Sequence, residues 1–319
     1  MKQEAIPAKP IKKTRRDELY ITLKKLNLLK HVQQLSEEGY CIVEDAIPPE
    51  MVKRLRDRVI EVGKDQLNKK RRSGQKFAQV GALFYKGRVF EEAVQLPKQV
   101  ALAEYMLGAN YSAWQFLASV RGEGTKGLPV HNDLGPGWRV PFQSFPEMCT
   151  SLYILDEFNQ DAGSTFVVPR THHLRRRPDI RNRKDRAYIE KHAIPIVAKP
   201  GSIAMWDARM WHGSLPRKLK GERVVLSYAA TRVYFRPSDD YTELPEEVFE
   251  RNDDFFARLV GRGIGYGELG IEAGVLFGGA RDANKTGAWI NEEENLSLLD
   301  TDKRLKTASV KFKPEGMDP

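Results

Sequence analysis

The sequence predicts an α+β protein whose core is an antiparallel β-barrel or jelly roll. In the N-terminal third, apolar side chains recur at helical spacing, whereas residues 112–235 contain short β-rich runs separated by Gly, Pro, Asn and Asp. Helices followed by many short strands favour this class over a parallel βαβ fold. A length of 319 residues with 41% hydrophobic side chains is sufficient for a substantial core.

The N-terminal third is expected to hold three helices and one strand. Leu19, Leu23 and Leu26 recur at helical spacing, and Gly39 is placed to end that helix. Pro49 occupies a position that the first turn of the next helix tolerates. The expected elements are helices at residues 17–38, 47–66 and 97–107, a strand at 40–44 and a surface loop at 67–77.

Short strands dominate the middle of the chain. Turn signals at residues 159–163 and 199–201 separate them, and a basic insertion at residues 172–192 interrupts the series. The expected strands cover residues 112–120, 148–155, 165–168, 194–197, 202–206 and 224–235.

The chain is expected to divide into three parts. Residues 1–16 are rich in Pro and Lys and are interpreted as a mobile basic arm, and residues 17–240 form the β-core domain with its N-terminal helices. Residues 241–319 form an extension that starts with a helix at 244–260 and then becomes Gly-rich. We expect this extension to act as a lid or as the contact of a homodimer.

The composition indicates a basic protein that stays in a reducing compartment. The net charge is +9 and the pI is near 9.3, but the positive runs are short, scattered and not interleaved with aromatic residues. A solvated basic face is therefore favoured over a nucleic-acid surface, and an anionic small-molecule substrate would benefit from the same field. No run approaches the roughly 18 apolar residues that span a bilayer. With only Cys41 and Cys149, a cytoplasmic location is expected.

The string GYGELG at residues 265–270 matches the dinucleotide-binding fingerprint letter for letter. This fingerprint requires a preceding strand and a following helix within a βαβ unit. Here the string follows an expected helix, and the sequence has no parallel βαβ pattern. We therefore interpret residues 265–270 as a loop.

The string His131-Asn132-Asp133 carries the clearest chemical signal. Two histidines and one carboxylate form the ligand set that suits ferrous iron and leaves half of its octahedron open. On a β-strand, His131 and Asp133 point to the same face, because side chains alternate with a period of two. His212, supplied by a neighbouring strand, would complete the set. The sequence therefore predicts an iron site at the mouth of the barrel, with open positions for a chelating co-substrate and dioxygen.

Residues that suit a carboxylate follow His212. Arg223 lies eleven residues beyond it and begins an apolar strand, and Ser214 lies two residues beyond it. If residues 203–212 and 223–228 form a hairpin-like pair, Arg223 returns close to His212 and faces the same cavity. A guanidinium binds a carboxylate through two parallel hydrogen bonds, and a serine hydroxyl can add a third. A metal chelator with a carboxylate at its far end describes 2-oxoglutarate.

Further motifs accompany these residues. They are AGSTFVVPRTH at residues 162–172, PGS at residues 200–202 and WHGS at residues 211–214. Together with the HxD string and Arg223, they resemble the phytanoyl-CoA dioxygenase family of iron(II)- and 2-oxoglutarate-dependent oxygenases. The resemblance spans residues 31–237, and its motifs are specific jointly although each is weak alone.

This resemblance implies a double-stranded β-helix fold of the jelly-roll, cupin-like kind. It implies Fe(II) bound by His131, Asp133 and His212, with 2-oxoglutarate, held by Arg223 and Ser214, and dioxygen as co-substrates. The implied reaction is hydroxylation, desaturation or a related C–H oxidation of an acyl, amino-acid or natural-product compound, with release of succinate and CO2. Because Asp133 is retained where halogenating relatives have a small residue, halogenation is not favoured.

Two positions depart from the family pattern. Relatives usually have Gly where Arg170 stands, so the shape of that turn is in question. Many relatives have an aromatic residue near the co-substrate where Leu152 falls. His172 and His173 are expected to close a turn beside the site, and Trp206 is expected in the core.

Five more residues are candidates for ligand contacts. Asn132 is assigned to the co-substrate because some relatives use this position, and Gln115 because it lies on the strand upstream. Trp138, Arg139 and Phe142 follow the HxD string on a loop expected to overhang the cavity, which makes them candidate substrate contacts. Core packing is the alternative role for these aromatic residues.

Three other interpretations of the chain remain open. A non-catalytic protein on the same fold would bind a metal or an acidic partner and release no succinate. A cupin-type metalloenzyme that needs no 2-oxoglutarate would not depend on Arg223. A nucleic-acid-directed oxygenase would bind oligonucleotides with steep salt dependence, because phosphate contacts release counterions.

Overall fold

Two antiparallel sheets face each other in the structure, a computed structural model that describes residues 14–262. The major sheet consists of β1 Tyr40–Val43, β2 Phe77–Val80, β3 Ser112–Gly122, β5 Met148–Ile154, β8 Ile203–Asp207 and β10 Glu222–Thr231, in the order β1-β8-β5-β10-β3-β2. The minor sheet consists of β4 Leu128–His131, β6 Thr165–Val168, β7 Ile194–Pro195 and β9 Trp211–Ser214, in the order β4-β9-β6-β7. The expected α+β class with a jelly-roll core is confirmed.

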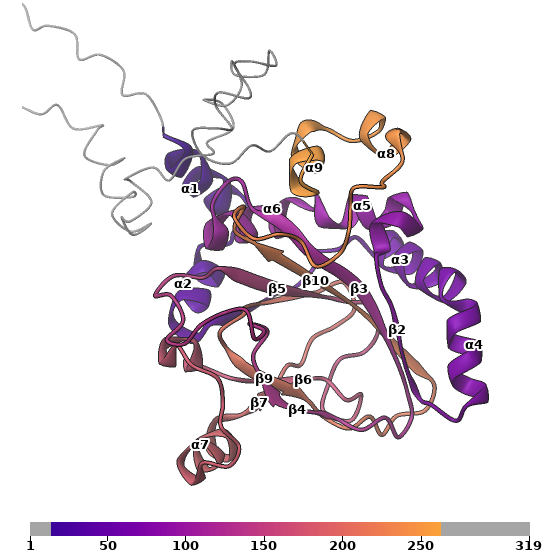
Figure 1. Cartoon of the computed structure of the whole chain (residues 1–319), viewed down its shortest axis with the longest axis vertical. Helices are drawn as coiled ribbons and strands as arrows, with labels where there is room; N and C mark the ends of the chain where they lie inside the picture. The colour runs from indigo at the N-terminus through magenta and orange to yellow at the C-terminus, as the bar shows by residue number, and fades with distance from the viewer. Residues whose placement is uncertain (1–13, 263–319) are drawn as a thin grey trace, which may run out of the picture.

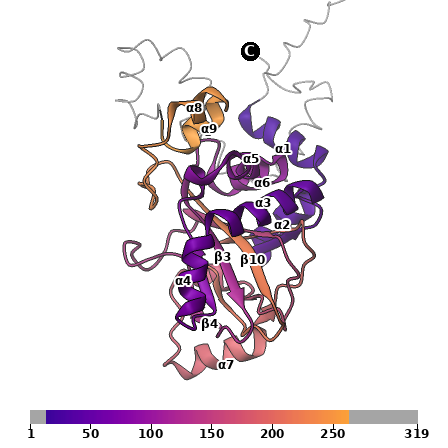
Figure 2. The same cartoon turned by 90° about the vertical axis from the view of Figure 1, so that its right-hand side faces the viewer.

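Helices cover the face of the major sheet that points away from the minor sheet (Figures 1 and 2). They are α1 Arg15–Lys25, α2 Leu29–Glu38, α3 Pro49–Val62, α4 Lys64–Arg72, α5 Arg88–Val94 and α6 Pro97–Leu107. The largest buried cluster lies between these helices and the sheet, with Phe84 of the short helix η1 Leu83–Lys86 packed against Phe116 of β3. No helix in residues 14–262 is long and apolar enough to cross a membrane.

The basic insertion contains two helical elements, η2 Thr171–Leu174 and α7 Arg183–His192. α7 lies beside the minor sheet, at the end of the molecule opposite α8 Glu246–Glu250 and α9 Asp254–Leu259 (Figures 1 and 2). The insertion therefore extends the side of the protein that carries the minor sheet, whereas the C-terminal helices extend the helical side.

Several expected elements differ from the observed ones. The expected helix at residues 244–260 is divided into α8 and α9, and the expected helix at 47–66 is divided between α3 and α4. The expected helix at residues 17–38 is divided into α1 and α2, because Asn27 adopts a φ of 57°, a left-handed conformation that asparagine tolerates better than most residues. The expected loop at residues 67–77 is helical as far as Arg72. Its lysines and arginines are good helix formers, and they occupy the last turn of α4, where positive charge complements the helix dipole.

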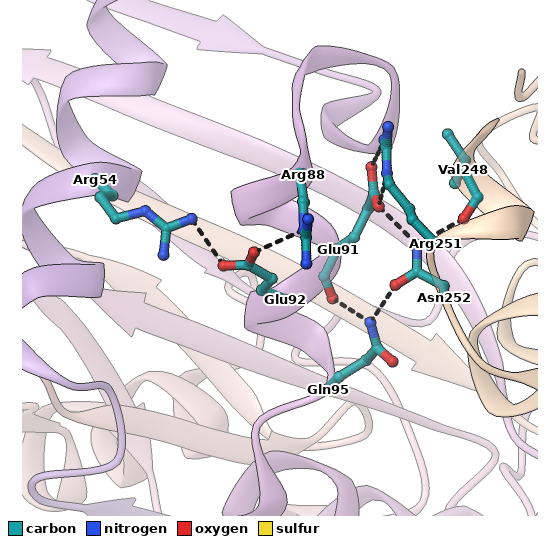
Figure 3. A network of polar contacts seen from close by, with 8 residues as sticks. All are labelled: Arg54, Arg88, Glu91, Glu92, Gln95, Val248, Arg251 and Asn252. Carbon is teal, nitrogen blue, oxygen red and sulfur yellow. Dashed lines mark hydrogen bonds and ion pairs between the residues drawn. The ribbon is translucent and has the colours of Figure 1, made fainter.

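The described part of the C-terminal extension is anchored to α5 by a buried carboxylate. Glu91 is fully buried and accepts hydrogen bonds from Arg251 and from Asn252, whose Nδ2 lies 2.7 Å from Glu91 Oε2 (Figure 3). Gln95 Nε2 donates to Asn252 Oδ1 over 2.8 Å. The glycine-rich string at 265–270 and the rest of the extension lie outside the described residues. A lid or dimer role for the extension therefore stays a prediction.

Candidate metal centre and co-substrate site

The three predicted metal ligands lie together where β4 ends. His131 is the last residue of β4 and pairs directly with His212 on β9, and Asp133 follows two residues later. Asp133 Oδ1 lies 3.3 Å from His212 Nε2 and 4.0 Å from His131 Nε2. One ligand atom from each residue falls within 4.8 Å of the others. The predicted neighbouring-strand position of His212 is thus observed.

Backbone carbonyls orient both imidazole rings. His131 Nδ1 lies 2.9 Å from the carbonyl oxygen of Pro129, and His212 Nδ1 lies 3.1 Å from that of Met210. Because a carbonyl only accepts, these contacts require a proton on Nδ1 and leave Nε2 of the neutral ring to bind a metal. The Nε2 atoms of both rings face Asp133. The rings therefore have the tautomer and the orientation that a bound metal needs.

Two donors hold the Asp133 carboxylate. Thr150 Oγ1 donates to Oδ2 over 2.7 Å, and Trp206 Nε1 donates to the same oxygen over 2.9 Å. Burial alone would raise the pKa of Asp133, but the His212 imidazole and the Thr150 hydroxyl hold this pKa well below its usual range. The carboxylate therefore stays ionised, with Oδ2 occupied and Oδ1 directed at the histidines.

The protonation of the histidines also suits a metal. Burial and the neighbouring His212 lower the pKa of His131, so its ring is neutral at neutral pH. Burial alone would lower the pKa of His212. The Asp133 carboxylate outweighs this effect and raises the pKa above its ordinary value. A divalent cation at this point would replace the proton that the carboxylate attracts. The donor set thus fits the three-ligand sites that keep open positions on non-haem iron.

Strand register places a polar row at the level of the metal ligands. Gln115 of β3, Ala229 of β10, Thr150 of β5 and Trp206 of β8 are successive cross-strand partners. Thr150 and Trp206 both donate to Asp133, so this row faces the interior between the sheets. Gln115 therefore lies at the same height along the sheet as the two residues that contact Asp133.

The expected hairpin-like pairing of residues 203–212 with 223–228 is wrong. β10 lies in the major sheet between β3 and β5, whereas β9 lies in the minor sheet. The segment between them carries the chain from one sheet to the other, a step that strand length and turn residues alone do not reveal. Arg223 nevertheless points into the interior, with 3% of its surface exposed.

Arg223 is buried and has no carboxylate partner among the described residues. Its Nη1 donates to the carbonyls of Gly163 and Ala162, its guanidinium lies 4.8 Å from the ring centre of Phe158, and its Nε has no partner in the described chain. Burial and the nearby arginines lower the pKa of Arg223 to about 9. An anion at this position would offset the cost of burying the positive charge and the repulsion between the arginines.

A second buried arginine, Arg121, was missed by the sequence-based prediction. It is the cross-strand partner of Arg223, and 5% of its surface is exposed. Arg121 Nη1 donates to Ser214 Oγ over 2.8 Å, and Arg121 Nε has no partner in the described chain. Ser214 therefore contacts Arg121 and not Arg223. Arg121 thus reaches the strand of His212 two residues along β9, and Arg223 is its cross-strand neighbour on β10.

The remaining candidates lie at different depths. Asn132 Nδ2 is buried without a partner in the described residues. Trp138 is half-buried, Arg139 is exposed, and Phe142 is buried at 1% exposure beneath the Arg177 guanidinium, 5.2 Å away. The ligand contacts assigned to these residues and to Gln115 stay predictions.

The structure shows where the two departures from the family pattern lie. Arg170 adopts a φ of 69°, so this turn keeps the left-handed conformation for which glycine is favoured. Leu152 lies in the interior cluster between the sheets. His172 Nε2 lies 3.2 Å from the carbonyl oxygen of Ser36, so this histidine joins η2 to α2.

A family model described as Phytanoyl-CoA dioxygenase (PhyH) matches residues 35–225. This match covers more than half of the chain, and the protein therefore belongs to the phytanoyl-CoA dioxygenase family of oxidoreductases. The assignment made from the motifs is confirmed. The family and the His-Asp-His triad together confirm the predicted cofactors, iron and 2-oxoglutarate.

Individual relatives are similar at low identity. The chain is 23% identical over 218 residues to Uncharacterized protein Rv1501 of Mycobacterium tuberculosis, covering 64% of this chain and 75% of that protein. It is 24% identical over 243 residues to Dioxygenase cdmD of Talaromyces verruculosus, covering 72% and 76%. Both alignments therefore extend over most of each partner.

Solved structures show the shared fold. HygX from Streptomyces hygroscopicus, solved with nickel and 2-oxoglutarate bound, superposes with a TM-score of 0.54 at 12% identity and covers 68% of this chain and 93% of its own. EctD from S. alaskensis, in its apoform, superposes with a TM-score of 0.55 at 15% identity and covers 66% and 79%. The double-stranded β-helix architecture is therefore common to all three chains.

Proposed function

We propose that the protein is an Fe(II)- and 2-oxoglutarate-dependent dioxygenase that oxidises a C–H bond of a small molecule and releases succinate and CO2. The observation that carries this proposal is the triad of His131, Asp133 and His212, with both Nε2 lone pairs and one carboxylate oxygen directed at a common point. The bound nickel and 2-oxoglutarate of HygX support it by analogy.

Each residue of the centre has a distinct part in this proposal. His131, Asp133 and His212 hold the metal, and Thr150 and Trp206 fix the carboxylate so that one oxygen faces the metal. When bound, the iron with its co-substrate supplies the oxygen activation, which no side chain can provide. The chain itself orients the ligands and keeps Asp133 ionised.

We assign the far carboxylate of 2-oxoglutarate to Ser214, Arg223 and Arg121. Buried charges in proteins are normally paired. Arg121 and Arg223 are buried cations that have only neutral partners among the described residues. The Ser214 hydroxyl, on the same strand as His212 and in contact with Arg121, supplies a further polar contact. An incoming carboxylate would pair these cations while the other end of the molecule reaches the metal.

The test is release of labelled CO2 from 2-oxoglutarate that carries the label at its 1-carboxylate, with Fe(II) and air. We expect slow release by the wild-type protein even without substrate, and loss of that release in Asp133→Ala. Circular dichroism establishes that the variant is folded. Release that persists in folded Asp133→Ala contradicts the proposal. Tight binding of metal and 2-oxoglutarate without any release would instead support the non-catalytic interpretation.

A further inference from the structure

The space between the two sheets has two ends. If 2-oxoglutarate occupies one of them, only the other end is left for the substrate. Arg121 and Arg223 lie six residues along β3 and β10 from Gln115 and Ala229, which mark the level of the metal ligands. If 2-oxoglutarate extends from the metal to the arginines, as proposed above, that end is filled. The substrate must then meet the metal from the opposite end.

That opposite end is aromatic. Trp138 packs edge-on against Trp114, with ring centres 6.0 Å apart, and its ring is tilted by 33° against that of Phe235 at 4.9 Å. The two tryptophans pack on a small cluster that contains Ala208. Ala208 accepts a hydrogen bond from the backbone amide of Asp133 over 3.0 Å. The aromatic wall of Trp114, Trp138 and Phe235 is therefore linked through Ala208 to the backbone of a metal ligand.

A β-bulge turns Trp114 toward this end. Gln115 pairs with Ala229 and Ala113 pairs with Ala230, so Trp114 is the extra residue that has no cross-strand partner. Ala113 belongs to the cluster under the helices, whereas Trp114 packs with the small cluster that contains Ala208. Bulges commonly re-aim side chains next to active sites. Without the bulge, the regular alternation of side chains along β3 would turn Trp114 to the other face of the sheet.

One polar group of the wall lacks a partner. Trp138 Nε1 is buried and has no hydrogen-bond partner in the described chain. An indole N–H can only donate, and buried polar groups without a partner are rare and generally explained by a ligand or water. An oxygen acceptor on a bound molecule would satisfy it. Gln115, at the metal level, offers an amide that can donate or accept.

Arginines hold the loop that carries Trp138. Arg177 Nη2 donates to the carbonyls of Gly135 and Trp138 over 2.6 and 2.9 Å, and Arg209 Nη1 donates to the carbonyl of Gln143 over 2.7 Å. The wall is therefore held in place before any ligand binds. Such a preformed surface favours rigid ligands, because little ordering remains to be done on binding.

We propose that the aromatic wall is the substrate subsite and that the substrate is a rigid, planar ring compound, neutral or anionic, with an oxygen acceptor for Trp138 Nε1. A flat ring covers aromatic faces fully, whereas an unbranched chain does not. A cationic ligand is disfavoured because Arg139 is exposed on the same loop. This proposal rests on the proposed function for the position of the metal and the co-substrate.

The experiment measures probe binding to the full-length protein loaded with Mn2+ and 2-oxoglutarate, by calorimetry. The probes are 2-acetylnaphthalene, naphthalene, decanamide and tetramethylammonium. We expect 2-acetylnaphthalene to bind at least about tenfold more tightly than each of the others, the effect of one hydrogen bond plus ring contact. In Trp138→Phe, which keeps a ring and removes the N–H, 2-acetylnaphthalene and naphthalene should bind alike. Tyr188→Phe, an exposed change on α7, is the matched control.

Each outcome decides the proposal. No binding of 2-acetylnaphthalene to the wild type, tighter binding of decanamide or tetramethylammonium, or an unchanged preference in folded Trp138→Phe would overturn it. Binding of 2-oxoglutarate is measured first, in the presence of Mn2+. If that first step fails, the proposed function fails, whereas failure of the probes after it succeeds removes only the substrate class.

Discussion

Trp206 shows how a single buried side chain can serve both packing and chemistry. Its ring belongs to the interior cluster, and its Nε1 donates to Asp133 Oδ2. Removal of that donor frees the carboxylate to rotate, because Thr150 alone then holds it. Partners of metal ligands typically change metal affinity without contacting the metal.

We therefore expect Trp206→Phe to weaken Mn2+ binding by about tenfold to a hundredfold. Calorimetry or competition with a chromogenic chelator measures this change. Trp211→Phe is the control, because Trp211 Nε1 donates to the carbonyl of Arg176 and not to Asp133. Equal metal affinities of both variants would show that the Asp133 contact does not support the site.

The second arginine makes a separate prediction at the same scale. We expect Arg121→Gln to weaken 2-oxoglutarate binding by about tenfold to a hundredfold, the effect of one hydrogen bond to a charged group. Binding of 2-oxovalerate, which lacks the far carboxylate, should be unaffected. Arg71→Gln removes an exposed ion pair with Glu222, next to Arg223 in sequence, and should change neither affinity. An equal loss for both ligands would assign Arg121 a structural role instead.

The residues of the site differ in how far the sequence reveals them. The HxD spacing and His212 make the triad predictable, but the expected strand at residues 130–134 ends at His131, so Asp133 reaches the site from the turn after β4 and not by strand alternation. Arg121 follows Gln115 by six residues and could have been found by extending the same alternation along β3. The roles of Thr150 and Trp206 could not have been found from the sequence. A buried threonine or tryptophan in a strand has the same sequence pattern whether or not it contacts a carboxylate.

Among the elements, η2 is attached to the end of α2 through His172. A Cβ added to Gly39, which has a φ of 87°, would lie 2.5 Å from His172 Nδ1, so the turn after α2 requires glycine on two grounds. Burial lowers the pKa of His172 to about 4, with His173 and Arg209 acting in the same direction and Asp207 opposing them. Burial therefore favours a neutral ring, whereas the Ser36 carbonyl, which accepts from Nε2–H, raises the pKa and opposes this effect.

This attachment predicts a loss of stability in acid. In the unfolded chain His172 takes up a proton near its ordinary pKa of about 6.5. In the folded protein the same ring is protonated only near pH 4. The contribution is complete above about pH 6.5 and is lost as pH falls, with a total of about 3 kcal/mol. Urea denaturation between these values should show a shallower pH dependence in His172→Gln than in the wild type. The control, His192→Gln on α7, should retain the wild-type slope.

Element boundaries show a limit of sequence patterns. The charged run at residues 67–72 suits a loop or an exposed helix equally, and only its packing through Leu67 decides for α4. The assignment of β9 and β10 to different sheets likewise depends on partners that are remote in sequence. Local turn and periodicity signals therefore predict most of the strands but not β2 or the bounds of β9, and the arrangement of the strands depends on long-range pairing.

For the whole molecule, the first helical turns of the C-terminal extension belong to the folded core. Phe256 of α9 is fully buried and packs edge-on against Phe84 at 5.3 Å. Tyr241 packs against the same ring at 5.2 Å. Glu91, fully buried on α5, depends on Arg251 and Asn252 for its partners.

A chain that ends at Pro237 should therefore be destabilised by at least about 4 kcal/mol, because it loses a buried aromatic side chain and leaves a buried carboxylate unpaired. A chain that ends at Arg262 keeps these contacts and is the matched control. Thermal and urea unfolding of the two chains measure the difference. Equal stabilities would show that α8 and α9 are dispensable to the fold.

The central claim is that the triad binds a metal that in turn binds 2-oxoglutarate. Calorimetric titration of 2-oxoglutarate into the protein, with and without Mn2+, in the wild type and in Asp133→Ala, tests it most directly. We expect binding only when both Mn2+ and Asp133 are present. Binding that is independent of the metal, or that survives in folded Asp133→Ala, would contradict the account.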